Sequence, residues 1–569
     1  MGGSGAGEDC VEAAQQQIRP AMTEGIISLN WEFLMQNTFT ALRVAAFAAV
    51  IGMMGLFPQS GRAQALEPIS YNLRVPAPDT HIAEVEAIFP TGGGALIEIM
   101  MAVWSPGFYR IEDYAQRVQG LSARTVDGAP LEVESTRKNR WRVHTEGRPR
   151  VVVTYRVNCE QRSVTTNYVG DDLGVINGAP TFITLVEQVR RPHEVRLDLA
   201  PKWKRSVTAL EPAADGKPNH YLAPDYDTLV DSPIVAGDPL VHDFEVDGSQ
   251  HFLVDIGDVG SFDGQKAAGE LRKIALETRG FWGFLPFKKY YYLNVFRRGG
   301  GGLEHKNSTL LTASAGRPAN AQANFGWLSF VSHEYFHAFN VKRLRPVELG
   351  PFDYEHPPNT SSLWISEGLT SYFGELIVVR AGLGSTEDYL RTLSSHINRL
   401  QDSPGRLVQT LEQSSLDVWS SGTSGVGRNR AKTVDYYVKG PIVGFLLDAR
   451  IRRITAGRKS LDDVMRLAYQ RYAGERGFTP EQFRAAADEV AGVGLAEWFR
   501  KAISSTEELD YSEALDWFGL RFATPKETEK TEDPKKKEAA AKWNLEVHPD
   551  ASGPQKKHLQ KLFEHAKSE

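Results

Sequence analysis

The segment His333-Glu334-Tyr335-Phe336-His337 constrains this chain more than any other feature of its sequence. On an α-helix, a separation of four residues is about 400° of rotation and about 6 Å of rise, so both imidazoles leave one face and can share a metal ion. Glu334 then lies beside that face, within reach of a water molecule at the metal. The alternative is an amphipathic helix whose histidines form ordinary core hydrogen bonds. The segment therefore predicts a metal-binding helix.

Composition restricts the class of protein and the kind of metal site. The chain has 569 residues, of which 41% are hydrophobic and 24% charged, as expected for a globular protein of several domains. Its formal net charge of −6 argues against nucleic-acid binding, which requires a basic face. There are only two cysteines, Cys10 and Cys159, so the sequence has neither a disulfide framework nor a four-thiolate zinc site. A metal here must use histidines and carboxylates.

A catalytic zinc site needs a third protein ligand and one open position. Glu367 is the best candidate, because it lies in the apolar run LWISEGLTSYFGELIVV, where an ionised carboxylate needs a cationic partner. A long loop containing four prolines separates Glu367 from His337. A ligand on a second helix is held more rigidly than one on a loop, so we favour Glu367 over four alternatives inside the loop: Glu348, Asp353, Glu355 and His356.

A glycine-rich segment, GGGGLEHKNS, follows the strand-like run at 289–296. Glycines at the edge of a sheet, here Gly301 and Gly302, let a peptide backbone approach closely and pair with it. Glu304 at the end of this segment could hold a positive charge, such as the free amino terminus of a substrate. The alternative is a flexible turn with a surface acid.

A tyrosine-containing motif, Tyr436-Tyr437-Val438-Lys439-Gly440, leads into the apolar run PIVGFLLDARI. A tyrosine at the start of such a helix can donate a hydrogen bond to an oxyanion, although most tyrosines there only pack.

The pattern of apolar residues divides the chain into regions. Residues 66–246 contain short runs rich in Val, Ile, Thr and Tyr, which predict an antiparallel β-sandwich or saddle. Residues 247–523 change to helical periodicity, and we expect them to form the catalytic domain. Residues 524–542 are a charged linker, and residues 543–569 read as a short strand and a helix. The predicted fold class is α+β with several domains.

The start of the chain has the order of a secretory signal at residues 35–65. A basic residue precedes a short apolar stretch at 44–57, and an A-x-A motif ends at Ala65. The stretch is too short for a membrane-spanning helix, and we expect residues 1–34 to be an over-extended start. For the apolar stretch at 44–57, the alternative to a cleaved signal is an uncleaved anchor or a buried hydrophobic helix. The prediction is a periplasmic or secreted protein without a stable membrane span after cleavage, whose Cys159 is a lone buried thiol.

With these motifs the sequence resembles the glycyl aminopeptidase family, which contains secreted or periplasmic zinc peptidases related to the alanyl aminopeptidase group. The resemblance covers about residues 70–525 and is most specific at GGGLEH, the histidine motif and WISEGLTSYF. It implies a β-saddle domain followed by a mostly helical, thermolysin-like catalytic domain of the gluzincin type. It also implies site residues: zinc ligands His333, His337 and Glu367, a base at Glu334, an amine-binding Glu304, and Tyr437 as the oxyanion donor.

The resemblance implies hydrolysis of the first peptide bond of a peptide, with Zn²⁺ as cofactor and with glycine or alanine as the first residue. A zinc endopeptidase built on the same site is one alternative, and a non-catalytic secreted binding protein is another. Family members usually carry a PDZ domain after the catalytic region. The linker at 524–542 is far shorter than such a domain, whereas the ending WNLEVHPDASGPQ is similar to the family's final segment. We therefore expect the PDZ domain to be missing.

Overall fold

The computed structural model of the chain describes residues 66–419, 432–523 and 543–564, apart from the single positions 187, 189, 298, 315, 317 and 319. The predicted signal at 35–65, the segment 1–34 and the linker at 524–542 lie outside the described residues. Among the residues described, no helix combines the length and the apolar character that a bilayer-spanning segment requires.

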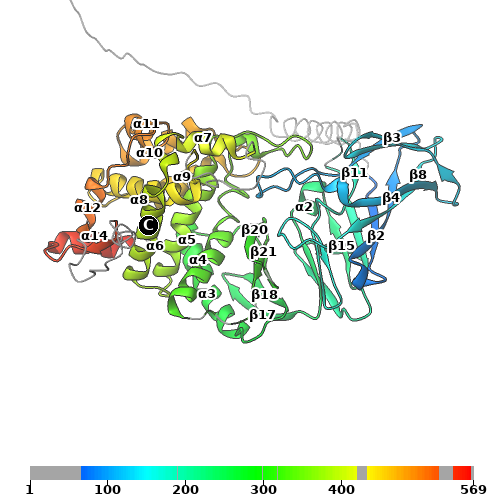
Figure 1. Cartoon of the computed structure of the whole chain (residues 1–569), viewed down its shortest axis with the longest axis horizontal. Coiled ribbons are helices and arrows are strands. Elements are labelled where there is room, and N and C mark those ends of the chain that lie inside the picture. The colour runs from blue at the N-terminus through cyan, green and yellow to red at the C-terminus, as the bar shows by residue number, and fades with distance from the viewer. Residues whose placement is uncertain are drawn as a thin grey trace, which may run out of the picture. The chain divides into compact units, whose positions relative to one another are not determined.

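Three largely antiparallel sheets form the first part of the described chain (Figure 1). The eight-stranded sheet has, in spatial order, β14 (Glu211–Pro212), β15 (His220–Ala223), β12 (His193–Asp198), β1 (Ile69–Arg74), β2 (Ile82–Pro90), β8 (Arg150–Asn158), β4 (Val118–Thr125) and β5 (Pro130–Leu131). One four-stranded sheet contains β13 (Arg205–Thr208), β16 (Ile234–Gly237), β10 (Leu173–Ile176) and β9 (Tyr168–Val169). The other contains β11 (Thr184–Leu185), β3 (Leu96–Met100), β7 (Arg140–His144) and β6 (Val133–Arg137).

These strands alternate buried and exposed side chains, as half-buried antiparallel strands must. In β2 the buried positions recur at every second residue, and they join one apolar cluster with the neighbouring strands. Cys159 is fully buried at the end of β8, which confirms the expectation for this thiol. Burial raises the pKa of Cys159 to about 12, so the thiol stays protonated and unreactive in the folded protein.

A fourth sheet of five strands opens the second part of the chain. Its order is β17 (Leu240–Val246), β18 (Ser249–Gly257), β19 (Lys289–Phe296), β21 (Ser308–Ala313) and β20 (Gly301–Glu304). The sequence had indicated only the run at 289–296 as a strand within this helical region. In β19, Tyr290 and Tyr292 join the core beneath the helices, whereas Leu293 and Val295 join a cluster shared with β10 and β16. Both faces of this sheet are therefore buried.

Helices make up the rest of the second part. They are α3 (Gly264–Trp282), α4 (Ala321–Phe336), α5 (Leu369–Arg380), α6 (Thr386–Gln401), α7 (Leu411–Leu416), α8 (Tyr436–Ile454), α9 (Leu461–Tyr472), α10 (Pro480–Ala491), α11 (Ala496–Ala502) and α12 (Ser512–Phe518), with a short α2 (Tyr226–Val230) in the first part. Two of these helices begin with a capping box: Ser385 forms one before α6, and Thr479 forms one before α10. Together with the four sheets, these helices confirm the predicted α+β architecture.

Helix α4 ends within the histidine motif that the sequence predicted to be helical. Its last residue is Phe336, and His337 is its C-cap. The physical reason lies at Asn340, whose side-chain amide donates to the backbone oxygen of Ile365 and to the hydroxyl of Thr370, both at 2.9 Å. These bonds to a second helical segment pull the chain away from the axis of α4.

The last described segment contains the expected strand and helix. Strand β23 (Leu545–Val547) pairs antiparallel with β22 (Leu520–Phe522), and α14 (Gly553–Leu562) follows with a capping box at Ser552. Leu559 and Leu562 are buried in the core that the helices of the second part share. The segment 543–564 therefore belongs to the apolar core of the second part of the chain.

Candidate active site and metal centre

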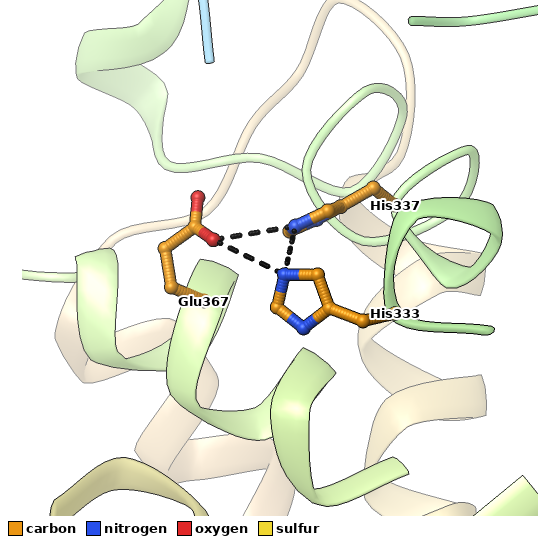
Figure 2. A group of neighbouring side chains, drawn as sticks. All are labelled: His333, His337 and Glu367. Carbon is orange, nitrogen blue, oxygen red and sulfur yellow. Dashed lines mark hydrogen bonds and ion pairs between the residues drawn. The ribbon is translucent and has the colours of Figure 1, made fainter. Parts of the chain in front are cut away.

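Three side chains from two helical segments converge on one point (Figure 2). His333 and His337 come from the end of α4, and their Nε2 atoms lie 2.9 Å apart. Glu367 comes from a π-helical turn, Trp364–Gly368, which leads into α5. Its Oε2 atom lies 3.2 Å from Nε2 of His337 and 3.6 Å from Nε2 of His333. Two ligands of a tetrahedral zinc ion are about 3.3 Å apart, so these separations fit one shared ion.

The remaining ring nitrogens have partners that favour metal binding. Nδ1 of His337 lies 2.7 Å from the backbone oxygen of Asn340, and Nδ1 of His333 lies 3.2 Å from the hydroxyl of Ser371. A ring whose Nδ1–H donates to oxygen presents the lone pair of Nε2 to a metal. The Ser371 hydroxyl itself donates to the backbone oxygen of Glu367 at 3.0 Å. One hydroxyl therefore links the first histidine to the turn that carries the carboxylate.

Tyr109 completes the surroundings of Glu367 from the first part of the chain. Its buried hydroxyl donates to Oε1 of Glu367 at 3.0 Å, while Oε2 faces the histidines. The two carboxylate oxygens of Glu367 therefore have different partners: Oε1 accepts from Tyr109, and Oε2 lies next to the histidine nitrogens. Contacts of this kind fix the orientation of a metal ligand and tune its basicity. Sequence reasoning missed Tyr109, Asn340 and Ser371, and for Tyr109 the partner lies 258 residues away.

The glycine pair Gly368 and Gly440 explains how the tyrosine motif reaches the site. A Cβ atom added to either residue would lie 2.5–2.6 Å from the Cα atom of the other, so the π-helical turn and α8 cross in direct backbone contact. Tyr437 lies in the first turn of α8, and its ring centroid is 6.2 Å from that of His333. The structure thus brings Tyr437 to the site, with 37% of the residue exposed.

Glu334, which follows His333 in α4, lies against strand β20. Only 5% of Glu334 is exposed, and its Oε2 atom has no hydrogen-bond partner among the described residues. A Cβ atom at position 302 would overlap the Glu334 carboxylate, so Gly302 is required by this close approach. The glycine-rich segment therefore brings the edge strand next to Glu334.

Glu304 ends β20, which is the edge strand of its sheet as the sequence suggested. Glu304 is 4% exposed, and its Oε1 atom also has no partner in the described part of the chain. A loop from the first part of the chain covers it, because a Cβ atom on Gly107 would overlap the Glu304 carboxylate. Gly107 has a φ of +94°, a conformation that glycine adopts most readily. Gly301 lies at the start of the same strand.

The charges at the centre favour a cation between these groups. Burial raises the pKa of Glu334 well above its usual range, and the acids Glu304 and Glu367 raise it further, although His337 opposes them. Burial also raises the pKa of Glu304 to about 7. Buried carboxylates gathered in this way are unfavourable without a positive partner. A divalent metal would supply that partner, and the two imidazoles with Glu367 have the chemistry of a zinc ligand set.

The loop alternatives to Glu367 do not approach the histidines. Glu355 accepts hydrogen bonds from Asn139 and Arg140, and Asp353 binds His356 at 2.9 Å. No interaction joins Glu348 to the metal centre within the described residues. The structure thus favours the carboxylate on the second helical segment.

Two family models match the sequence. The Peptidase M61 N-terminal domain matches residues 70–238, and the M61 glycyl aminopeptidase domain matches residues 326–443. The second range contains both histidines, Glu334, Glu367 and Tyr437. No curated protein is similar enough to count as a match.

Solved structures have the same fold. The aminopeptidase N family protein from Idiomarina loihiensis is 27% identical over 80% of both chains, with a TM-score of 0.75. The M1 zinc metallopeptidase from Deinococcus radiodurans is 13% identical, with a TM-score of 0.50, over 78% of this chain and 95% of the other. The second similarity concerns the fold alone.

We expect the substitution Tyr109→Phe to weaken metal binding by about 10- to 100-fold, because it removes the hydrogen bond that orients Glu367. Competition between the protein and a chelator of known zinc affinity measures the effect. The matched control is Tyr114→Phe, which removes another buried hydroxyl nearby, one that contacts Ser105 instead. Equal metal affinities of the two variants would contradict the role assigned to Tyr109.

Proposed function

The chain belongs to the M61 glycyl aminopeptidase family and is a peptidase, and on that premise we propose that it is a zinc-dependent aminopeptidase. The observation that carries the proposal is the convergence of His333, His337 and Glu367 within reach of one ion. When bound there, zinc supplies a Lewis acid that polarises the substrate carbonyl and makes water more acidic. The alternative, a zinc endopeptidase, would use the same three residues.

Glu334 is the proposed proton carrier. Its carboxylate is buried beside the histidines and has an unpartnered oxygen, and burial raises its pKa well above the usual range. A carboxylate with such a pKa accepts a proton from the attacking water and returns it to the leaving amine. The hydroxyl of Tyr437, on the side of His333, donates to the oxyanion that develops on the carbonyl.

Glu304 is the proposed recognition group for the free amino terminus. An ionised carboxylate with an unpartnered oxygen in a buried setting binds an ammonium group strongly. The position of Glu304 on an edge strand supports this role, because the substrate backbone can pair with β20 while its amine reaches the carboxylate. Binding the amine at a fixed place would leave only the first peptide bond near the metal ligands.

The close cover of Glu304 supports a preference for small first residues. Gly107 approaches the carboxylate so closely that even a methyl group would not fit at that position. We propose that the same loop limits the space beside the bound amine, in keeping with the description of the family as glycyl aminopeptidases.

The substitution Glu334→Gln should lower kcat by about 10²- to 10⁴-fold, since the amide cannot accept a proton from water. The three metal-binding side chains remain, so zinc content measured by elemental analysis should match that of the wild type. Turnover near the wild-type rate in the zinc-loaded variant would exclude Glu334 as the base.

Acetylation of the substrate amine should prevent cleavage by the wild-type enzyme. The substitution Glu304→Gln should lower kcat/KM for the free-amine peptide by about 10- to 100-fold, the size expected for loss of a hydrogen bond to a charged group. Kinetics with the two forms of one short peptide measure both effects. Equal cleavage of both forms by the wild type would indicate an endopeptidase.

A series of aminoacyl anilides tests the size preference. We expect kcat/KM to be highest for glycine and alanine and to fall for leucine and phenylalanine, because one poorly accommodated methylene already costs about 1–3 kcal/mol. The chelated enzyme serves as the blank. A higher kcat/KM for phenylalanine than for glycine would reject the steric limit at Gly107.

A further inference from the structure

The short edge strand β20 needs support from outside its own sheet. Among the described residues it pairs with one neighbour, β21, through the register Gly301 to Glu304 against Thr312 to Thr309. Glu304 is the last residue of β20, so the position of its side chain depends on the turn at 305–307 that follows. The end of a four-residue edge strand is held by few backbone bonds and is free to fray. Interactions at this turn therefore decide where the Glu304 carboxylate lies.

Asp231 holds this turn from the first part of the chain, where it follows α2 (Figure 1). Its Oδ2 atom accepts a hydrogen bond from the backbone N–H of Lys306 at 2.7 Å. Its Oδ1 atom lies 3.2 Å from Nδ1 of His305, whose ring is buried. Two consecutive residues directly after Glu304 are thus bound to one carboxylate.

The same carboxylate also binds the segment that follows the metal-binding helix. Nζ of Lys342 lies 2.6 Å from Oδ1 of Asp231, and only 5% of the Lys342 side chain is exposed. The backbone N–H of Lys342 donates to the oxygen of His337 at 3.1 Å. Asp231 therefore connects the turn after Glu304 to the segment after His337.

The charge of Asp231 is retained in this setting. Burial alone would raise the pKa of Asp231, but Lys342 and His305 hold it well below its usual range. The carboxylate is therefore ionised at neutral pH, and an ionised acceptor makes hydrogen bonds about twice as strong as neutral ones.

We infer that Asp231 is a positioning residue for Glu304, which it places for recognition of the substrate amino terminus by holding the turn at 305–307. The inference rests on the proposed function, because it assigns a purpose to the amine-binding role of Glu304. It makes the first part of the chain a determinant of exopeptidase selectivity, although that part contributes no metal ligand.

The test combines Asp231→Asn and Glu304→Gln in a double-mutant cycle on the full, zinc-loaded chain. A short peptide with a free amine is the substrate. We expect Asp231→Asn alone to raise KM about tenfold, within the range of coupling between neighbouring residues, with a smaller change in kcat and unchanged zinc content. In the Glu304→Gln background, Asp231→Asn should cause no further rise in KM, because its effect acts through Glu304.

The matched control is Glu355→Gln. Glu355 also joins the two parts of the chain, through Arg140 at 2.7 Å and Asn139 at 2.9 Å, but it does not contact the turn at 305–307 in the described structure. Its KM should match that of the wild type. A similar rise in KM for Glu355→Gln would assign the effect to general contact between the two parts and overturn the inference.

Other outcomes separate the two proposals. If the wild type cleaves free and acetylated peptides equally, the proposed aminopeptidase function fails. If the wild type requires the free amine but Asp231→Asn raises KM equally in both backgrounds, or lowers only kcat, the inference about Asp231 fails alone.

The variant is expected to fold, because Asp231 and Lys342 line a cavity of about 690 Å³ where water can solvate the lysine. If Asp231→Asn has no cooperative thermal transition, His305→Gln replaces it in the same cycle. Loss of the ring weakens the bond to Asp231 while leaving the carboxylate in place, and the same two results support or overturn the inference.

Discussion

The site depends on one electrostatic constraint: three buried acidic side chains and two imidazoles, of which only that of His337 is buried, lie in a small volume. Glu304, Glu334 and Glu367 are each at most 5% exposed. Such a group of carboxylates is unfavourable in a protein interior unless a cation lies among them. Apolar packing around α4 and α5 holds the helices in place. The packing therefore keeps the three carboxylates close together, and a metal ion would stabilise them.

The first part of the chain completes the site that the second part begins. Tyr109 donates to the carboxylate of Glu367, and Gly107 covers Glu304. Asp231 binds the turn that follows Glu304. An apolar cluster beneath the five-stranded sheet joins the two parts through Val175 and Val295, among others. The β-rich part therefore shapes the proposed amine-binding end of the site, while the helical part carries the proposed metal ligands and the proposed base.

Sequence reasoning selected three residues, from local patterns, that the structure brings together. His333 and His337 are one helical turn apart, and Glu367 is an acid in an apolar run. The predicted arrangement of the two histidines on one helix face holds although α4 ends at Phe336, because His337 still has the backbone conformation of the helix. The family resemblance also predicted the order of a β domain and a helical domain, which the structure confirms.

The remaining parts of the site could not be predicted because they depend on contacts between distant segments. Tyr109 looks like any aromatic residue between strands, and Asp231 looks like an ordinary acid after a short helix. The close contact between the backbones of Gly368 and Gly440 leaves no pattern in the sequence, because it depends on how two distant segments pack. Strands β18 and β21 of the five-stranded sheet were missed as well. In β18 and β21 consecutive buried residues carry no alternating pattern, since both faces of the sheet are covered.

X-ray absorption spectroscopy of the zinc-loaded protein tests the central claim most directly. The account predicts one zinc per chain, with two imidazole nitrogens at about 2.0–2.1 Å, one protein carboxylate, and one oxygen from solvent in the open position. Anomalous diffraction should place that ion between His333, His337 and Glu367. An ion with four protein ligands, or a protein that binds no zinc at these residues, would contradict the account.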